Sequence, residues 1–326
     1  MTTLPQPLTE AEAGLKNAVA GEGVRATQVN ILRSIAGYAE LTKVRVTSLV
    51  MMSAWCGFYL GSLKSGVSSV SWTLVHAVLG IGLVAGGTAA LNQVIERDLD
   101  ALMRRTNRRP LPAGRMSARR AAIFGAATTL LGIAYLALAT NALTALLTLA
   151  TSAAYLGAYT PLKRVSPWCT FVGAFPGAMP PVLGWTAARG WLGWEPLALF
   201  AILWVWQFPH FHSIAWLYRE DYERARIRML PVVEHDGRST AREIILYSLL
   251  LIPVSVAPSL LGMSGWIYAG GALALSGIFF WTGARLAALK ATPAEPHSKT
   301  RARHVLQASV FYLPLLFGLL MLSATP

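Results

Sequence analysis

The sequence changes character at one stretch, which reads Asn92-Gln-Val-Ile-Glu96-Arg-Asp98-Leu-Asp100-Ala-Leu-Met103-Arg-Arg105-Thr106-Asn-Arg-Arg109-Pro110. It directly follows an apolar run that ends near Leu91, so it lies where a membrane helix meets water. Three carboxylates and five arginines fall between Glu96 and Arg109, in a chain of which only 13% is charged. Ionisable groups at the end of a membrane span are costly and mark functional sites. This stretch is therefore a candidate functional site.

The composition is that of a polytopic membrane protein. The 326 residues are 54% hydrophobic, and the charged fraction is about half of the ~25% found in soluble domains. A net charge of +13 would suggest a nucleic-acid partner in a soluble protein, but in a membrane protein basic residues set the topology, and we expect no nucleic acid. Cys56 and Cys169 both fall in apolar segments, which indicates structural thiols and no disulfide framework.

Residues 1–36 are polar and include Glu10, Glu12 and Glu22. This segment lacks the apolar core of a signal peptide, and its acidic residues argue against a mitochondrial transit peptide. We predict a disordered or surface N-terminal tail with a surface helix near residues 29–38. Residues 37–326 are predicted to form a single transmembrane domain.

Nine segments are apolar enough to cross a bilayer, which requires roughly 20 residues each. They are 46–63, 73–94, 121–140, 142–159, 166–187, 196–217, 243–262, 265–288 and 305–323. The fifth contains Pro176, Pro180 and Pro181, which predicts a kinked helix whose freed carbonyls need partners or a cavity. The expected fold is all-α, with nine transmembrane helices around a central cavity.

The charges support this count. With nine spans, 26 of the 28 lysines and arginines fall on one side, and only Lys64 and Arg189 fall on the other. The positive-inside rule then places the N-terminus in the cytoplasm and the C-terminus outside. Eight of the 15 acidic residues lie in two connections on that same side, residues 96–100 and 220–236.

The spacing in the first acidic connection suits a metal ion. Asn92, Glu96 and Asp100 follow each other at i, i+4 and i+8, so they lie within about 80° of each other on one helix face. Carboxylate and amide oxygens suit Mg²⁺, which keeps positions for substrate phosphates, and arginine binds phosphate oxygens in a bidentate manner. The stretch therefore predicts a Mg²⁺–diphosphate site. The alternative is a solvated, charge-balanced loop that only obeys the positive-inside rule.

Six motifs between residues 38 and 235 together resemble the UbiA-type intramembrane prenyltransferase superfamily, and in detail its haem branch. Besides residues 92–110, they are Leu41-Thr42-Lys43-x-Arg45; Tyr159-Thr160-x-Leu162-Lys163-Arg164; Gly173-x₃-Gly177-Ala178-x-Pro180-Pro181-x₂-Gly184-Trp185; and the pair Trp206-Gln207-x-Pro209-His210-Phe211 and Asp221-Tyr222-x-Arg224-Ala225-x₂-Met229-Leu230-Pro231. Several positions depart from the pattern. Glu96 stands where aspartate is more common, Val44 where proline is usual, Cys169 where asparagine is usual, and Ala225 where many members have a second aspartate. Arg226 and Arg228 replace glycine and proline.

The resemblance implies transfer of the farnesyl group of farnesyl diphosphate to a vinyl group of haem b, which gives haem O. It implies Mg²⁺ as cofactor, haem b as substrate, and an active site at the cytoplasmic face of a bacterial inner membrane, within the lipid bilayer. A haem A synthase stays open as a partner. Two other functions also stay open: a prenyltransferase for a quinone precursor or chlorophyllide, and an organic-anion transporter.

The resemblance also assigns residues. The implied metal ligands are Asn92, Glu96, Asp100 and Asp221, and the implied cationic partners of the diphosphate are Lys43, Arg105, Arg109, Lys163 and Arg164. Further candidate substrate contacts are Tyr159, Tyr222, Trp206 and Gln207. His210 is a candidate for binding haem iron, orienting a propionate or moving a proton, and the plain alternative is a helix-end histidine bonded to a neighbour. Asp98 and Glu223 are expected to be solvated or paired with arginines.

Overall fold

The computed structural model describes residues 34–234 and 236–325. The described chain is helical throughout, and its one β feature is an isolated bridge between Ser264 and Ala324. This confirms the predicted all-α class. The predicted tail lies largely outside the described residues, but residues 34–41 are helical, and a turn at Thr42 and Lys43 separates them from the first span.

Eight of the helices are long and apolar enough to cross a membrane. In chain order the elements are α2 (Val44–Leu63), α3 (Trp72–Leu102), α4 (Ala118–Ala139), α5 (Ala142–Ala154), η1 (Tyr155–Tyr159), α6 (Thr160–Leu162), α7 (Cys169–Ala178), α8 (Pro180–Arg189), α9 (Glu195–Leu217), α10 (Arg219–Arg224), α11 (Leu230–Val233), α12 (Arg238–Leu260), α13 (Trp266–Ala287) and α14 (Pro296–Leu322). The candidate spans match the predicted segments closely, with α5, η1 and α6 forming one of them.

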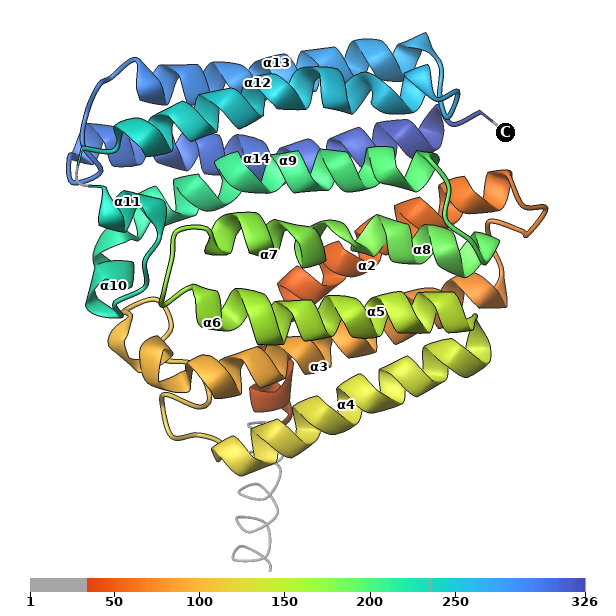
Figure 1. Cartoon of the computed structure of the whole chain (residues 1–326), viewed down its shortest axis with the longest axis horizontal. Coiled ribbons are helices and arrows are strands. Elements are labelled where there is room, and N and C mark those ends of the chain that lie inside the picture. The colour runs from red at the N-terminus through yellow and green to blue at the C-terminus, as the bar shows by residue number, and fades with distance from the viewer. Residues whose placement is uncertain (1–33, 235, 326) are drawn as a thin grey trace, which may run out of the picture.

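The long helices run side by side along one direction (Figure 1). The largest apolar core lies where α9, α12, α13 and α14 pack together, and it includes Trp216, Tyr268 and Phe279. A second core joins α2, α3, α4, α5 and α8. The short helices α10 and α11 lie together at one end of the bundle (Figure 1).

The fifth predicted span is broken, as its prolines predict. Helix α7 ends at Ala178 and α8 begins at Pro180, and the two follow each other in line across the bundle (Figure 1). Proline cannot donate the helical hydrogen bond and clashes with the preceding turn, so Pro180 and Pro181 separate the halves. Together α7 and α8 occupy the position of the fifth predicted span, residues 166–187. The count of nine spans, the central cavity and the orientation of the termini stay predictions.

Helix α3 is longer than a bilayer requires. It has 31 residues, which corresponds to about 46 Å at 1.5 Å per residue. A hydrocarbon core of ~30 Å needs only about 20 of them, which takes the helix from Trp72 to about Leu91. The turns that carry Asn92, Glu96 and Asp100 therefore continue beyond the apolar layer.

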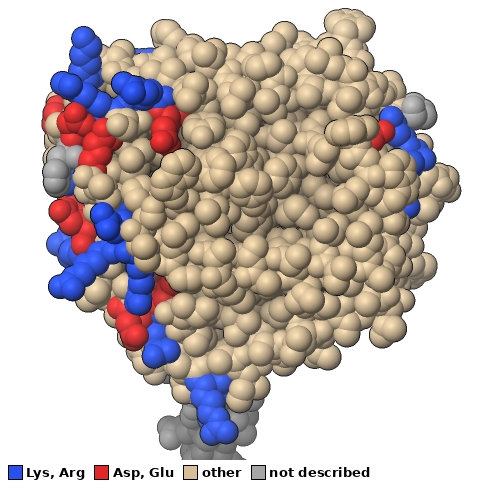
Figure 2. Space-filling model, viewed as in Figure 1, with Lys and Arg blue, Asp and Glu red and all other residues tan. Residues whose placement is uncertain are grey.

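Charge gathers at the end of the bundle where α10 and α11 lie (Figure 2). A broad uncharged belt follows, and a few charged groups lie at the opposite end (Figure 2). There Lys64 pairs with Glu195 at 3.4 Å and ties the end of α2 to the start of α9. This arrangement confirms the predicted segregation of charge, and it assigns Glu195 a structural role, as expected.

Helices α2 and α8 approach each other closely, and two glycines permit it. A Cβ atom added at Gly57 would lie 1.9 Å from the Pro181 carbonyl oxygen, and one at Gly184 would lie 1.8 Å from that of Ala54. Small residues at such crossings allow backbone contact in membrane bundles, where packing holds helices together.

We expect Gly57→Ala to lower the free energy of unfolding by about 1–3 kcal/mol, because α2 and α8 must separate to admit the methyl group. The thermal unfolding midpoint of the detergent-solubilised protein measures this. Gly277→Ala in α13 is the matched control, since a Cβ there meets nothing within 4 Å. Equal midpoints for the two variants would contradict the close crossing.

Candidate active site at the charged end of the bundle

The acidic face of α3 is buried, and each of its members holds a basic side chain. Asn92, Glu96 and Asp100 are 0%, 8% and 1% exposed. Lys43 Nζ donates to Asn92 Oδ1 at 3.1 Å. Lys163 Nζ lies 2.7 Å from Glu96 Oε1. The three residues share one face, as the spacing predicts, and this is a buried polar row rather than a solvated loop.

The third cation, Arg109, is returned to the helix by a tight turn. Helix α3 ends at Leu102, and the Thr106 hydroxyl, 1% exposed, donates to the Asp100 carbonyl at 2.8 Å. The Arg109 amide donates to the Thr106 carbonyl at 2.9 Å. Arg109 Nη1 then reaches Asp100 Oδ2 at 2.7 Å. Thr106 thus positions Arg109. Thr106 lies within the motif of residues 92–110, but its role was not predicted because the sequence pattern does not specify this turn.

Lys43 is placed by the segment that precedes α2. The Gln93 amide of α3 donates to the carbonyls of Leu41 and Glu40 at 2.8 and 3.2 Å, which fastens this segment to α3. Lys43 has φ 49 and ψ 53, a left-handed conformation that is uncommon for residues other than glycine. Burial, together with the positive charges of Arg109 and Lys163, lowers the pKa of Lys43 to about 7. The main cause is the loss of water around the buried Lys43 amine.

Lys163 comes from the distorted end of the α5 span. The segment Tyr155–Tyr159 is a π-helix, which occurs mostly as single turns at functional sites. Pro161 explains it, because its missing N–H and its ring disrupt the α-helical pattern. Thr160 faces α3 as a result, and its hydroxyl accepts from Asn92 Nδ2 at 3.2 Å.

Two contacts hold the Lys163 side chain in place. Its Nζ lies 4.4 Å from the Tyr159 ring centroid, in addition to the ion pair with Glu96. Burial opposes the charge on Lys163, but Tyr159 and Glu96 outweigh it and raise the pKa of the amine above its ordinary value. Arg164 is exposed on the following loop.

The second acidic connection docks on the first. Asp221 of α10 is 7% exposed, and its Oδ2 accepts the Arg105 backbone N–H at 3.1 Å. Its Oδ1 pairs with Arg224. The Arg105 side chain donates to the Tyr222 hydroxyl at 3.2 Å, and its guanidinium lies 5.1 Å from the Tyr218 ring centroid. The structure thus brings together stretches that are about 116 positions apart.

A third connection completes this end of the bundle. Arg228 donates its backbone N–H to the Lys163 carbonyl at 2.9 Å, and Arg226 adopts a left-handed φ of 54°. Beneath the loops, Cys169 packs with Met229 in a small apolar cluster. Cys169 is therefore a packing residue here. Both arginine side chains are exposed, so at position 228 the backbone makes the contact.

The expected bystanders behave as predicted. Asp98 is exposed and pairs with Arg97 at 3.5 Å, and Glu223 lies 3.9 Å from Arg219.

The three candidates in the central part of α9 contact other helices rather than the residues of the acidic row. Trp206 and His210 stack with ring centroids 4.5 Å apart. Trp206 Nε1 donates to the Ser309 carbonyl of α14, and the ring nitrogen Nδ1 of His210 lies 2.7 Å from the Ser309 hydroxyl. Gln207 donates to the carbonyls of Ala174 and Leu203, which joins α9 to α7. Their predicted substrate contacts stay predictions.

The donor set fits a hard metal ion that shares its ligands with a substrate. Glu96 and Asp100 use one carboxylate oxygen each, and within the described chain Glu96 Oε2 and Asp100 Oδ1 have no protein partner. The described residues contain no group of three acidic, histidine or cysteine side chains close enough to hold an ion by themselves. That suits Mg²⁺, which is commonly bound by one or two carboxylates plus phosphate oxygens.

Comparisons with known proteins agree with this geometry. Residues 50–306 match the UbiA prenyltransferase family. The chain is 60% identical over 288 residues to the Protoheme IX farnesyltransferase of Koribacter versatilis, covering 88% of this chain and 93% of that one. It is 50% identical to the enzyme of the same name from Solibacter usitatus, covering 88% and 98%.

Solved structures share the fold. A digeranylgeranylglyceryl phosphate synthase superposes with a TM-score of 0.71 at 15% identity, covering 89% of this chain and 98% of that one. A UbiA homologue from Archaeoglobus fulgidus bound to GPP and Mg²⁺ superposes with a TM-score of 0.62 at 18% identity, covering 87% and 99%. The chain belongs to the UbiA prenyltransferase family, in the branch of the protoheme IX farnesyltransferases.

Proposed function

We propose that the protein transfers the farnesyl group of farnesyl diphosphate to the vinyl group of haem b to make haem O. The allylic C–O bond breaks and diphosphate leaves, a C–C bond forms to the vinyl group, and water adds its hydroxyl to the other vinyl carbon and loses a proton. The observation that carries the proposal is the buried row of Asn92, Glu96 and Asp100, with a cation from a different segment on each member. The relatives of 50–60% identity are named for this activity and are covered almost end to end.

The charge balance of the site calls for an anion. Glu96, Asp100 and Asp221 each pair with one cation, and these are Lys163, Arg109 and Arg224. The side chains of Lys43 and Arg105 add two further basic groups that contact Asn92 and Tyr222 rather than an acid. The excess is positive in a partly buried region, where electrostatic interactions are stronger than in water. A diphosphate satisfies this excess and matches the donor geometry of arginine.

Asn92, Glu96, Asp100 and Asp221 are the residues that would hold Mg²⁺. When bound, Mg²⁺ would neutralise the charge that develops on the diphosphate as the allylic C–O bond ionises. The protein's own contribution is to hold Lys43, Arg109 and Lys163 around the leaving group before it departs. Such preorganised charges lower the barrier without reorganisation at the moment of reaction.

The apolar interior of the bundle would hold the farnesyl chain and keep water from the allylic cation. Trp206, Gln207 and His210 stay candidate contacts for haem b, and Tyr159 and Tyr222 stay candidate contacts for the diphosphate. We place the protein in the bacterial inner membrane with its charged end in the cytoplasm, because 26 of its 28 basic residues fall on the side predicted to face inward. A haem A synthase remains a candidate partner.

Asp100→Asn should reduce prenyl transfer by about a hundredfold or more, because it removes a negative ligand worth several kcal/mol at the leaving group. The shape of the side chain is kept, so the thermal unfolding midpoint should change little. Steady-state turnover with farnesyl diphosphate and Mg²⁺ is the measurement.

Asp98→Asn is the matched control, since it makes the same chemical change two residues away on an exposed side chain. It should keep wild-type turnover. A folded Asp100→Asn protein with wild-type turnover would refute the metal role.

The acceptor is tested separately. Membranes that contain this chain should convert haem b and farnesyl diphosphate to the hydroxyethylfarnesyl adduct, detected by mass spectrometry. 4-Hydroxybenzoate should give no prenylated product under the same conditions. Turnover of 4-hydroxybenzoate but not of haem b would contradict the assignment of haem b as acceptor, while prenyl transfer itself would still be supported.

A further inference from the structure

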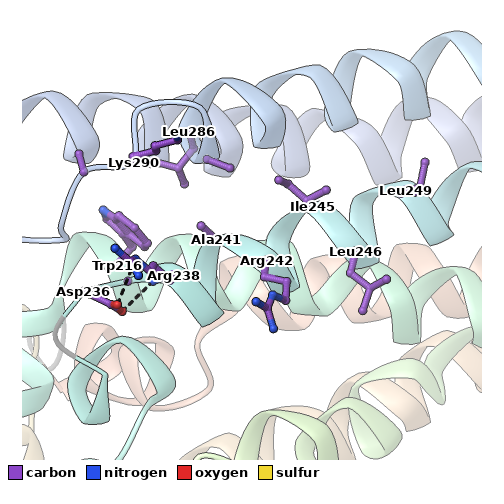
Figure 3. Close-up of a pocket in the computed structure, with 13 residues that line it drawn as sticks. Trp216, Asp236, Arg238, Ala241, Arg242, Ile245, Leu246, Leu249, Leu286 and Lys290 are labelled. Carbon is purple, nitrogen blue, oxygen red and sulfur yellow. Dashed lines mark hydrogen bonds and ion pairs between the residues drawn. The ribbon is translucent and has the colours of Figure 1, made fainter.

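A pocket lined by basic residues lies outside the candidate active site. It has a volume of about 620 Å³ and lies between the N-terminal half of α12 and the segment after α13, with Trp216 of α9 at its inner wall (Figure 3). Arg238, Arg242 and Lys290 line it, together with the apolar side chains of Ile245 and Leu286. None of these residues belongs to the site described above.

Among the described residues, two of the three cations have no side-chain partner. Arg238 Nε pairs with Asp236 Oδ2 at 3.3 Å (Figure 3). Arg242 and Lys290 are exposed and make no ion pair or hydrogen bond through their side chains within the described residues. After the Asp236–Arg238 pair is set aside, the pocket keeps the uncompensated charge of Arg242 and Lys290.

The start of α12 does not supply the anion site. The backbone N–H of Arg238 donates to Asp236, and those of Ser239 and Thr240 donate to Glu234. Carboxylates of this chain therefore already accept hydrogen bonds from the backbone N–H groups in the first turn of α12. An anion in this pocket would be held by the side chains of Arg242 and Lys290.

An apolar track continues from the pocket along α12. A second pocket of about 360 Å³ is lined by aliphatic residues and shares Leu246 and Leu249 with the first. These two leucines are 55% and 50% exposed. From Arg242 to Pro253 the helix rises about 16 Å, which is close to half of a ~30 Å hydrocarbon core. The dimensions are those of one leaflet.

We propose that this groove binds one anionic phospholipid of the surrounding membrane. The positive charge of Arg242 and Lys290 attracts its phosphate to the head of the groove, and one acyl chain follows Leu246, Leu249 and Pro253. Basic pockets between membrane helices attract anionic headgroups, and burial of the chain on an exposed aliphatic face adds to this attraction.

Two other anions fit less well. A free phosphate ester would leave the aliphatic track exposed. Haem b would find no histidine, cysteine or methionine among the described residues that line the two pockets. A phospholipid uses both the charged and the aliphatic part of the groove.

Native mass spectrometry of the purified full-length protein in neutral detergent tests the proposal, with dioleoyl phosphatidylglycerol and dioleoyl phosphatidylcholine as probes. The wild-type protein should bind phosphatidylglycerol in preference to phosphatidylcholine. The double variant Arg242→Gln/Lys290→Gln should bind phosphatidylglycerol about thirtyfold more weakly, from ~1 kcal/mol per basic residue near the membrane. Its affinity for phosphatidylcholine should not change.

The control double variant Arg119→Gln/Arg120→Gln makes the same change of charge at two exposed arginines of α4. It should keep the wild-type affinity for phosphatidylglycerol. Soluble glycerol phosphate should not displace the lipid. Equal binding of the two lipids by wild-type protein, an equal loss in both double variants, or displacement by equimolar glycerol phosphate or haem b would each overturn the proposal.

Discussion

Burial of the carboxylates of α3 is the constraint on which the charged end of the protein depends. A carboxylate that loses water costs several kcal/mol unless a partner and hydrogen bonds replace the water. Glu96 and Asp100 are both almost fully buried, so a cation has to reach each of them. Lys163 and Arg109 come from different connections to do so. The loops at this end are thus ordered by the same charges that would bind substrate.

Because α3 is long, the need to pair its buried carboxylates determines how the loops at this end are arranged. The helix carries its polar row past the apolar layer, and the connections from α2, α6 and α10 fold over it there. The Arg105 N–H contact requires the Asp221 carboxylate, whereas the Arg228 N–H and the Lys163 carbonyl join two backbones. Proline, which the family pattern has at position 228, could not donate this second bond. At position 226 the left-handed φ of 54° is one that glycine adopts without strain.

The sequence predicted most of the fold and the content of the site, but not its pairings. Apolar runs of sufficient length and the prolines of the fifth span act locally, so the helices and the break at Pro180 could be read from them. The partner of each acid is a tertiary property. Lys163 reaches Glu96 because a π-helical turn reorients the end of its span. Gln207 resembled a substrate ligand, yet its amide joins α9 to α7. Thr106 acts through a turn that no spacing rule specifies.

Pairing also separates two kinds of positive charge that the sequence cannot distinguish. By the positive-inside rule, Lys163 and Arg242 are equivalent residues on one side of the membrane. In the structure Lys163 contacts a buried carboxylate, whereas Arg242 lies beside exposed leucines and has no partner in the described chain. A cation held by a buried acid is fixed and preorganised for chemistry. A cation beside exposed leucines has no such partner and is available to anions from the surrounding membrane. Our two proposals therefore divide the excess of lysine and arginine between the substrate diphosphate and a phospholipid.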